Sequence, residues 1–205
     1  MNPAYIHPAS LVESQDIGSE TRIWAFTHVM EGASIGTRCN IGEHCFIESG
    51  AKLGNNVTVK NGNMIWDGVI LEDGVFIGPH VLFTNDRYPR SPRLQEARSR
   101  YLGKEWLLST LVQRGASVGA GATLLAGVTV GSFAMVGAAT VVTRNVPAYA
   151  LMVGVPARQI GWVCLCGQPL RFEQCMALCN HCHRQYTNQS DSIGPVLAAN
   201  LAVTS

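Results

Sequence analysis

The chain has 205 residues, of which 47% are hydrophobic and 14% are charged, and its mean hydropathy is +0.14. Fifteen basic residues nearly balance fourteen acidic ones, and this net charge of +1 argues against a dedicated nucleic-acid-binding protein. No apolar run reaches the roughly 18 residues of a membrane span, and the first ten residues lack the features of a secretory signal, so we expect a cytoplasmic protein.

A six-residue period of large apolar residues runs from Leu11 to Phe83. A helix, with its period of about 3.6 residues, does not match this spacing, and each interior glycine would cost a helix about 1 kcal/mol. The pattern instead predicts short strands joined by tight turns, with the large residue of each hexad pointing inward. The thirteen positions are Leu11, Ile17, Ile23, Val29, Ile35, Ile41, Ile47, Leu53, Val59, Ile65, Leu71, Ile77 and Phe83.

The period is interrupted once and then resumes in a new phase. Residues 87–110 carry no hexad, whereas the period returns at Val112 and continues to Val142. We therefore expect residues 87–110 to form an inserted loop. Between residues 87 and 105 this loop has six basic side chains against two acidic ones, a local net charge of +4. Such a charge suits the steering of small anionic substrates, and the alternative is a loop that is only solvated.

These repeats resemble those of the hexapeptide-repeat family. The resemblance implies an all-β chain whose hexads form a left-handed parallel β-helix, with three hexads in each triangular coil. Residues three hexads apart would then lie above one another at the strand spacing of about 4.8 Å. We expect this β-helix, with its inserted loop, to occupy residues 1–162.

This stacking predicts one candidate site. Asp67 and Asn85 are three hexads apart, each two positions after a core residue, and Asp86 follows immediately before the loop. A carboxylate here could orient an amine or accept its proton. The alternative is that these residues only form turns at the corners of the coil. We favour the functional interpretation because the set lies beside the large insertion.

Three segments extend the resemblance to nucleotide-sugar N-acetyltransferases. They are VFIGPHVLFTNDRYPRS (75–91), TLVQRGASVGAGATLLAGVTVG (110–131) and AMVGAATVVTRNVPAYALMVGVPARQIGW (134–162). The resemblance implies acetyl transfer from acetyl-CoA to the 3-amino group of a nucleotide-linked sugar, in a homotrimer that binds acetyl-CoA between neighbouring solenoids. In relatives acting on dTDP-3-amino-3,6-dideoxyhexoses, the positions of Asp67, Asn85 and Asp86 surround the sugar amine.

We expect two positions to contact the acetyl-CoA. Backbone N–H groups of the second repeat block, for example near Ala138, could polarise the thioester oxygen, and Arg158 resembles a position that relatives place near the CoA phosphates. His80 is interpreted as a corner residue rather than a base. The alternatives are a UDP-3-amino-uronate or other UDP-amino-sugar N-acetyltransferase, which Asp86 disfavours because those relatives usually lack it, and a non-enzymatic β-helix scaffold.

Five of the seven cysteines lie between Cys164 and Cys182. Cys164 and Cys166 form one close pair, and Cys179 and Cys182 form another, a pattern typical of a structural zinc site with four thiolate ligands. The segment resembles the zinc ribbon appended to some of these acetyltransferases, so we expect a zinc-ribbon-like unit over residues 163–187 and a loosely held tail over 188–205. The spare candidate ligands are Cys175, His181 and His183.

Overall fold

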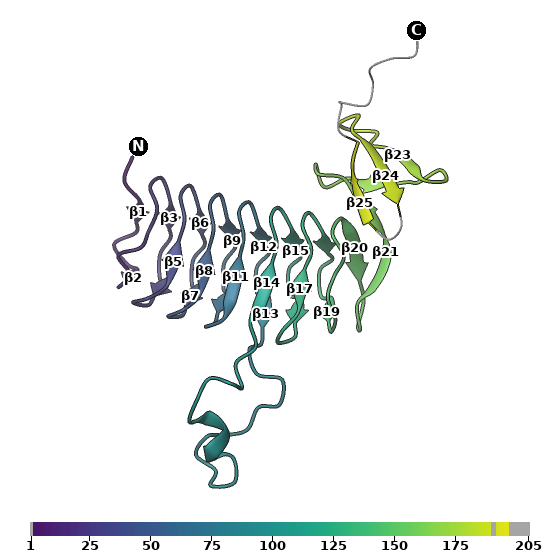
Figure 1. Cartoon of the computed structure of the whole chain (residues 1–205). Coiled ribbons are helices and arrows are strands. Elements are labelled where there is room, and N and C mark those ends of the chain that lie inside the picture. Colours follow the sequence, from purple (N-terminus) through teal and green to yellow (C-terminus); the bar gives the residue numbers. More distant parts are fainter. Residues whose placement is uncertain (1, 190–191, 197–205) are drawn as a thin grey trace.

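The computed structural model describes residues 2–189 and 192–196. Figure 1 shows a solenoid of short stacked strands, with one long loop projecting from its side and a small three-stranded unit at its C-terminal end. In the described part of the chain the helical structure is limited to the 3-10 helix η1 (Arg98–Tyr101) in the loop. The predicted all-β fold is thus confirmed as a β-solenoid of parallel strands.

Three sheets form the sides of the solenoid, and the chain visits them in turn. The ten-strand sheet contains β1 (Tyr5–Ile6), β3 (Arg22–Ile23), β6 (Asn40–Ile41), β9 (Thr58–Val59), β12 (Phe76–Ile77), β15 (Ser117–Val118), β18 (Met135–Val136), β20 (Ala150–Val153), β21 (Arg158–Val163) and β22 (Pro169–Leu170). The seven-strand sheet contains β2 (Leu11–Val12), β4 (His28–Val29), β7 (Phe46–Ile47), β10 (Met64–Ile65), β13 (Leu82–Phe83), β16 (Thr123–Leu124) and β19 (Val141–Val142). The five-strand sheet contains β5 (Ser34–Ile35), β8 (Lys52–Leu53), β11 (Val69–Leu71), β14 (Thr110–Val112) and β17 (Thr129–Val130).

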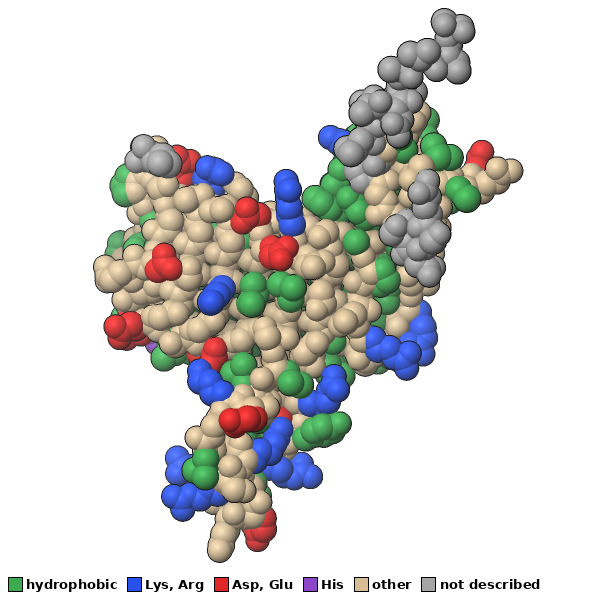
Figure 2. Space-filling model, viewed as in Figure 1, with side chains coloured by type: hydrophobic (Ala, Val, Ile, Leu, Met, Phe, Trp, Pro, Cys, Tyr) green, Lys and Arg blue, Asp and Glu red, His purple; other side chains and the backbone are tan. Residues whose placement is uncertain are grey.

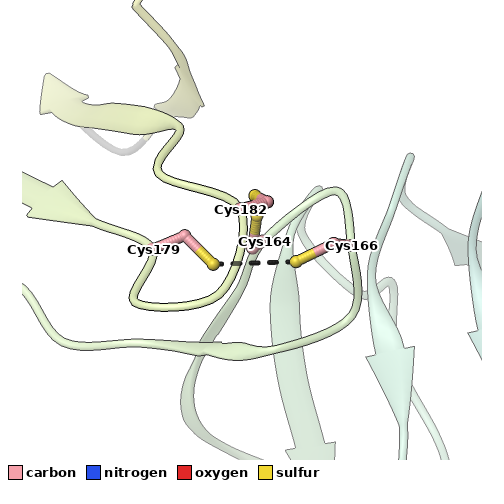
Figure 3. Close-up of side chains that lie close together, drawn as sticks. All are labelled: Cys164, Cys166, Cys179 and Cys182. Carbon is pink, nitrogen blue, oxygen red and sulfur yellow. Dashed lines mark hydrogen bonds between the residues drawn. The ribbon is translucent and has the colours of Figure 1, made fainter.

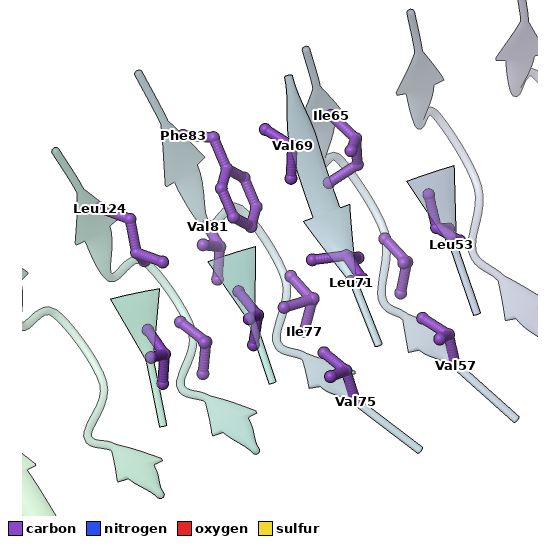
Figure 4. Packing of buried hydrophobic residues seen from close by; sticks show 14 of the residues in the cluster. Leu53, Val57, Ile65, Val69, Leu71, Val75, Ile77, Val81, Phe83 and Leu124 are labelled. Atoms are coloured by element: carbon purple, nitrogen blue, oxygen red, sulfur yellow. The ribbon is translucent and has the colours of Figure 1, made fainter. Parts of the chain in front are cut away.

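The hexad residues fill the core of the solenoid. From Ile23 to Phe83 every predicted inward position is buried, and the second block from Val112 to Val142 is buried as well. Figure 4 shows these aliphatic side chains meeting inside the coils. The polar Asn63 is also buried, and its amide group donates to the carbonyl oxygen of Gly78 and accepts from the N–H of Val81.

The first member of the predicted series is an exception. Leu11 is 57% exposed, and Val12 packs against the core in its place. The reason is the register of the first coil. Val12 pairs with Val29, so this coil is one residue shorter than the regular coils in the middle of the solenoid, in which residues such as Lys52 and Ile70 pair. The hexad prediction was therefore wrong at Leu11.

The inserted loop lies between β13 and β14. Ile70 in β11 pairs with Lys52 of the preceding coil and with Leu111 of the following coil. The loop therefore lengthens one coil without interrupting the stacking of the strands. The two ends of the loop meet at an antiparallel bridge between Asp86 and Leu107. The N–H of Leu108 donates to the carbonyl oxygen of Asn85 at 2.9 Å, which closes the neck of the loop.

The C-terminal unit has a small core of its own. Strands β23 (Met176–Leu178), β24 (Gln185–Gln189) and β25 (Ser192–Pro195) form an antiparallel sheet. The ring of Tyr186 is buried and contacts the ring of Tyr149 from the last coil at a centroid distance of 6.0 Å. The expected tail boundary at residue 188 falls inside β24, because β24 pairs with β25 beyond it; the expected tail over 197–205 lies outside the described residues.

Candidate active site

Asp67 lies at the corner between the seven-strand and five-strand sheets. It follows β10, and its carboxylate Oδ2 accepts a hydrogen bond from Nζ of Lys104 at 2.7 Å. Lys104 belongs to the inserted loop, far along the chain from Asp67. The loop therefore returns to the corner from which it departs, and it delivers an ammonium group to the predicted carboxylate.

Asn85 occupies the same corner one coil further on. Because Met64 pairs with Leu82, the register places Asn85 above Asp67, at a spacing of about 4.8 Å between coils. The side chain of Asn85 is half-buried, and within the described residues its amide group makes no hydrogen bond. The predicted pair thus presents one carboxylate and one free carboxamide at a single corner.

Asp86 is also at this corner, but its carboxylate is already occupied. Nη1 of Arg100 donates to Oδ2 at 2.9 Å, Nη2 donates to Oδ1, and the hydroxyl of Tyr101 donates to Oδ2. The hydrogen bonds from Arg100 lower the pKa of the Asp86 carboxyl below its usual value. These contacts favour a role for Asp86 in anchoring the loop, whereas its predicted contact with a sugar amine stays a prediction.

Glu48 belongs to the site and was not predicted from the sequence. Its Oε2 accepts a hydrogen bond from the backbone N–H of Asp67 at 2.8 Å, and its charge contributes to the raised pKa of Lys104. Glu48 directly follows Ile47, so in the register of the coils it aligns with Trp66 rather than with Asp67. A comparison of equivalent corner positions alone therefore overlooks it.

Two glycines allow the close approach of chain segments at this corner. Gly50 has a φ of +91°, and a Cβ atom there would collide with the carboxylate of Asp67. Gly68 has a φ of +82°, and a Cβ atom there would lie 2.7 Å from the side chain of Leu107. Any larger residue at position 50 would displace the carboxylate of Asp67, and any larger residue at position 68 would displace the side chain of Leu107.

Basic side chains gather around the projecting loop, as Figure 2 shows. Arg87, Arg93 and Arg98 are exposed, and none of them forms an ion pair with another described residue. Beside them a hollow of about 470 Å³ is lined by Arg87, Tyr88, Ser99, Arg100, Glu105, Trp106 and Leu108. Free guanidinium groups next to such a hollow suit an anionic ligand.

The predicted CoA-binding residues lie elsewhere on the same chain. Ala138 stands at the corner between the ten-strand and seven-strand sheets, where its backbone N–H donates no hydrogen bond to a described residue. Arg158 begins β21, and the N–H of the preceding Ala157 donates to the carbonyl oxygen of Val141 at 2.8 Å. The seven-strand sheet therefore separates these two residues from the corner of Asp67.

The four predicted metal ligands converge in the C-terminal unit. Figure 3 shows the side chains of Cys164, Cys166, Cys179 and Cys182 pointing toward one another. Their sulfur atoms all lie within 4.8 Å of one another, with Cys164 and Cys182 at 3.3 Å and Cys166 and Cys179 at 3.6 Å. Zinc bonds of about 2.3 Å in a tetrahedron hold sulfurs about 3.8 Å apart, so this donor set fits the ion.

Backbone N–H groups favour the thiolate form of Cys179 and Cys182, whereas burial raises the pKa of Cys164. The N–H of Arg184 lowers the pKa of Cys182 to about 6, and the N–H of Cys182 lowers the pKa of Cys179.

The spare candidates Cys175, His181 and His183 are not part of the cluster, which is the sole group of metal-ligating side chains within the described residues.

His80 and the two cysteines within the repeats, Cys39 and Cys45, have structural positions. His80 is exposed at a corner with a φ of +54°, and its ring lies directly over Gly62. Cys39 and Cys45 are buried at two other corners, and burial raises the pKa of both thiols. Packing therefore accounts for all three residues.

Comparison with known proteins adds a decisive observation. The family model described as "Bacterial transferase hexapeptide (six repeats)" matches residues 16–49 and 50–85. The chain is 50% identical over 182 residues to the dTDP-3-amino-3,6-dideoxy-alpha-D-galactopyranose 3-N-acetyltransferase of Aneurinibacillus thermoaerophilus, covering 89% of this chain and 90% of that protein. The chain is a hexapeptide-repeat acyltransferase.

Solved structures share the fold of this acyltransferase. The acetyltransferase domain of PglB from Neisseria gonorrhoeae, in complex with acetyl coenzyme A, aligns with a TM-score of 0.50 at 21% identity, over 77% of this chain and 58% of that one. A point mutant of AntD, an N-acyltransferase from Bacillus cereus in complex with dTDP and coenzyme A, aligns with a TM-score of 0.50 at 15% identity, over 78% and 83%. None of the described segments is a helix long and apolar enough to span a bilayer.

Proposed function

We propose that this acyltransferase moves the acetyl group of acetyl-CoA to the 3-amino group of a dTDP-linked 3-amino-3,6-dideoxyhexose. One observation carries the proposal. The carboxylate of Asp67 binds the primary ammonium group of Lys104, and it does so beside the free carboxamide of Asn85. A sugar ammonium has the same charge and the same hydrogen-bond donors. The high identity to a dTDP-3-amino-sugar 3-N-acetyltransferase over nearly the whole chain supports the nucleotide and the position of the amine.

The reaction needs only a positioned, neutral amine and a polarised thioester. The amine nitrogen forms a bond to the acetyl carbonyl carbon, the carbon–sulfur bond breaks, and the departing CoA thiolate ends as the thiol with the proton that the amine loses. We assign to Asp67 the orientation or deprotonation of the amine, and to Asn85 the fixing of the acceptor sugar. The N–H of Ala138 would donate to the thioester oxygen as it becomes negative.

This assignment requires a second copy of the chain. Asp67 and Ala138 lie at different corners of one solenoid, so a neighbouring chain must bring its Ala138 to this Asp67. The outer face of the seven-strand sheet lies between the two corners and exposes apolar side chains, among them Met64 at 41% and Leu82 at 58%. We propose that this face is covered in a homotrimer, with acetyl-CoA in the groove between neighbours; light scattering of the purified protein should give three chains per particle.

We assign the hollow beside the loop to the nucleotide diphosphate. The exposed Arg87 lines it, and the side chains of Trp106 and Tyr88 offer aromatic surface at its wall. A guanidinium suits the phosphates, and an aromatic ring suits a nucleobase. The exposed arginines of the loop would draw in both anionic substrates.

The cysteine cluster is proposed to hold a structural zinc ion. Four thiolates fill a tetrahedral site and leave no position for substrate, so the ion would stabilise the C-terminal unit without taking part in acetyl transfer. Thiolates remain available to a metal in a reducing compartment, and we therefore place this activity in the cytoplasm.

A panel of nucleotide-linked amino sugars tests the proposal. The purified protein would be incubated with acetyl-CoA and, separately, with dTDP-3-amino, dTDP-4-amino and UDP-3-amino sugars, and free CoA thiol would be measured. We expect the fastest release with a dTDP-3-amino-3,6-dideoxyhexose. A clear preference for a UDP-3-amino-uronate would move the assignment to that alternative, and no release with any sugar would leave the scaffold interpretation.

A further inference from the structure

We propose that Lys104 competes with the substrate for the carboxylate of Asp67. The sugar ammonium must displace the Lys104 side chain in order to bind there. The inference rests on the proposed function, because it takes Asp67 as the residue that holds the amine. It goes beyond that function because it assigns a role to a loop residue: Lys104 sets how strongly the enzyme prefers a charged amino sugar over a neutral sugar.

The first argument is position. Nζ of Lys104 lies 2.7 Å from Oδ2 of Asp67, which is the contact expected of a bound sugar ammonium. The carboxylate of Glu48 adds a second negative charge to the surroundings of this ammonium group. Asp67 is thus already paired before a substrate arrives.

The second argument is charge. The hydrogen bond to Asp67 raises the pKa of Lys104, so this side chain stays cationic at neutral pH. A substrate amine is also cationic when it first binds; it gives one proton, through Asp67, to solvent before it attacks the thioester, and the acetylated product is a neutral amide. Lys104 can therefore be exchanged for the substrate at one carboxylate, and it returns to Asp67 once the charge of the substrate has been lost.

The third argument is that Lys104 is free to leave. Its side chain is 79% exposed, and in the described part of the chain the ammonium group has Asp67 as its sole hydrogen-bonding partner. The fold of the loop does not depend on this ion pair, because Arg100 and Tyr101 hold the loop to Asp86 separately. Exposed ion pairs of this kind are weak, which makes displacement by a ligand inexpensive.

The test compares charged and neutral ligands in Lys104→Met, Lys104→Arg and the wild type. The Kd values of a dTDP-3-amino-3,6-dideoxyhexose and of its 3-hydroxy analogue would be measured by calorimetry, and KM and kcat would be measured for the amine. In Lys104→Met the preference for the amino ligand over the hydroxy ligand should rise about two- to fivefold, since an exposed pair is worth up to about 1 kcal/mol. KM for the amine should fall in this variant without a gain in kcat, and Lys104→Arg should stay near the wild type because it keeps the charge.

Lys60→Met provides a matched control, because it removes one exposed lysine from a corner of the solenoid away from the loop. The inference is overturned if Lys104→Met leaves the ligand preference unchanged, shifts both ligands equally or weakens the amino ligand, or if Lys60→Met gives the same shift. A wild-type protein that releases CoA from acetyl-CoA in the presence of the amino sugar, while Lys104→Met shows no altered preference, would contradict this inference alone. A wild type that neither binds nor acetylates the amino sugar would contradict the proposed function, and the inference with it.

Discussion

The guanidinium of Arg100 donates to both carboxylate oxygens of Asp86, and thereby ties the middle of the inserted loop to the coil from which the loop departs. The hydroxyl of Tyr101 donates to the same carboxylate at 2.9 Å. The loop carries the ammonium of Lys104 to Asp67 and lines the hollow beside it. The Asp86–Arg100 pair is therefore the contact on which the shape of the candidate site depends.

Replacing Arg100 by Met should loosen the loop while the solenoid stays folded. The change leaves the largely buried carboxylate of Asp86, 9% exposed, without its charged partner, and hydrogen bonds of this kind contribute about 1.5–3 kcal/mol. Hydrogen exchange of residues 87–109 should accelerate, whereas the melting temperature of the solenoid should change little, because its core contains no loop residue. Unchanged exchange in the loop would contradict the anchoring role of the pair.

The same pair predicts a pH dependence. Because the pKa of Asp86 is lower in the folded protein than its ordinary value of 3.8, the carboxylate stabilises the loop above that value. The stabilisation is lost as the pH falls below 3.8 and through the lowered pKa. Loop protection, corrected for intrinsic exchange rates, should hold from neutral pH down to about pH 4 and then fall; the Arg100→Met variant should lack this transition.

Gly50→Ala should reduce both stability and activity. The added methyl would collide with the Asp67 carboxylate, and the φ of +91° is strained for alanine, at a cost of about 1–3 kcal/mol. Gly121→Ala is the matched control, because position 121 has a φ of +65° but nothing within 4 Å of the added Cβ. Both variants should melt earlier, and only Gly50→Ala should lose acetyl transfer beyond what its lower stability explains.

Metal analysis of the purified protein should find one zinc ion per chain. Cys179→Ser should lose the metal and unfold the C-terminal unit, because Cys179 is buried in the small core of that unit. Cys175→Ser should keep the metal, since Cys175 is exposed and outside the cluster. Metal-free wild-type protein, or equal loss in the two variants, would rule out the zinc site.

The periodicity of the sequence predicts the fold because each inward position recurs in the strand register. It fails at Leu11, where a coil one residue shorter than the regular coils shifts the phase, and turn residues alone do not reveal such a shortening. The convergence of the four cysteines could also be predicted, because close pairs of thiols leave few geometric choices. These features are local or periodic.

The rest of the site depends on contacts that no period encodes. Lys104 reaches Asp67 from a distant part of the chain, through a loop whose path follows from the Asp86–Arg100 pair. The contact of Asp86 with Arg100 could not be predicted for the same reason, since Arg100 lies in a segment without a repeat. Glu48 was missed because it contacts the backbone of Asp67 from a neighbouring corner position rather than from an equivalent one.

The central claim is that Asp67 holds the acceptor amine, and the kcat/KM of Asp67→Asn with a dTDP-3-amino-3,6-dideoxyhexose tests it most directly. Asp73→Asn is the control, because Asp73 also lies at a corner, where it caps the N–H of Asn55. We predict that kcat/KM falls at least about a hundredfold in Asp67→Asn and stays within about threefold of the wild type in Asp73→Asn. A kcat/KM close to the wild type in Asp67→Asn would contradict the account.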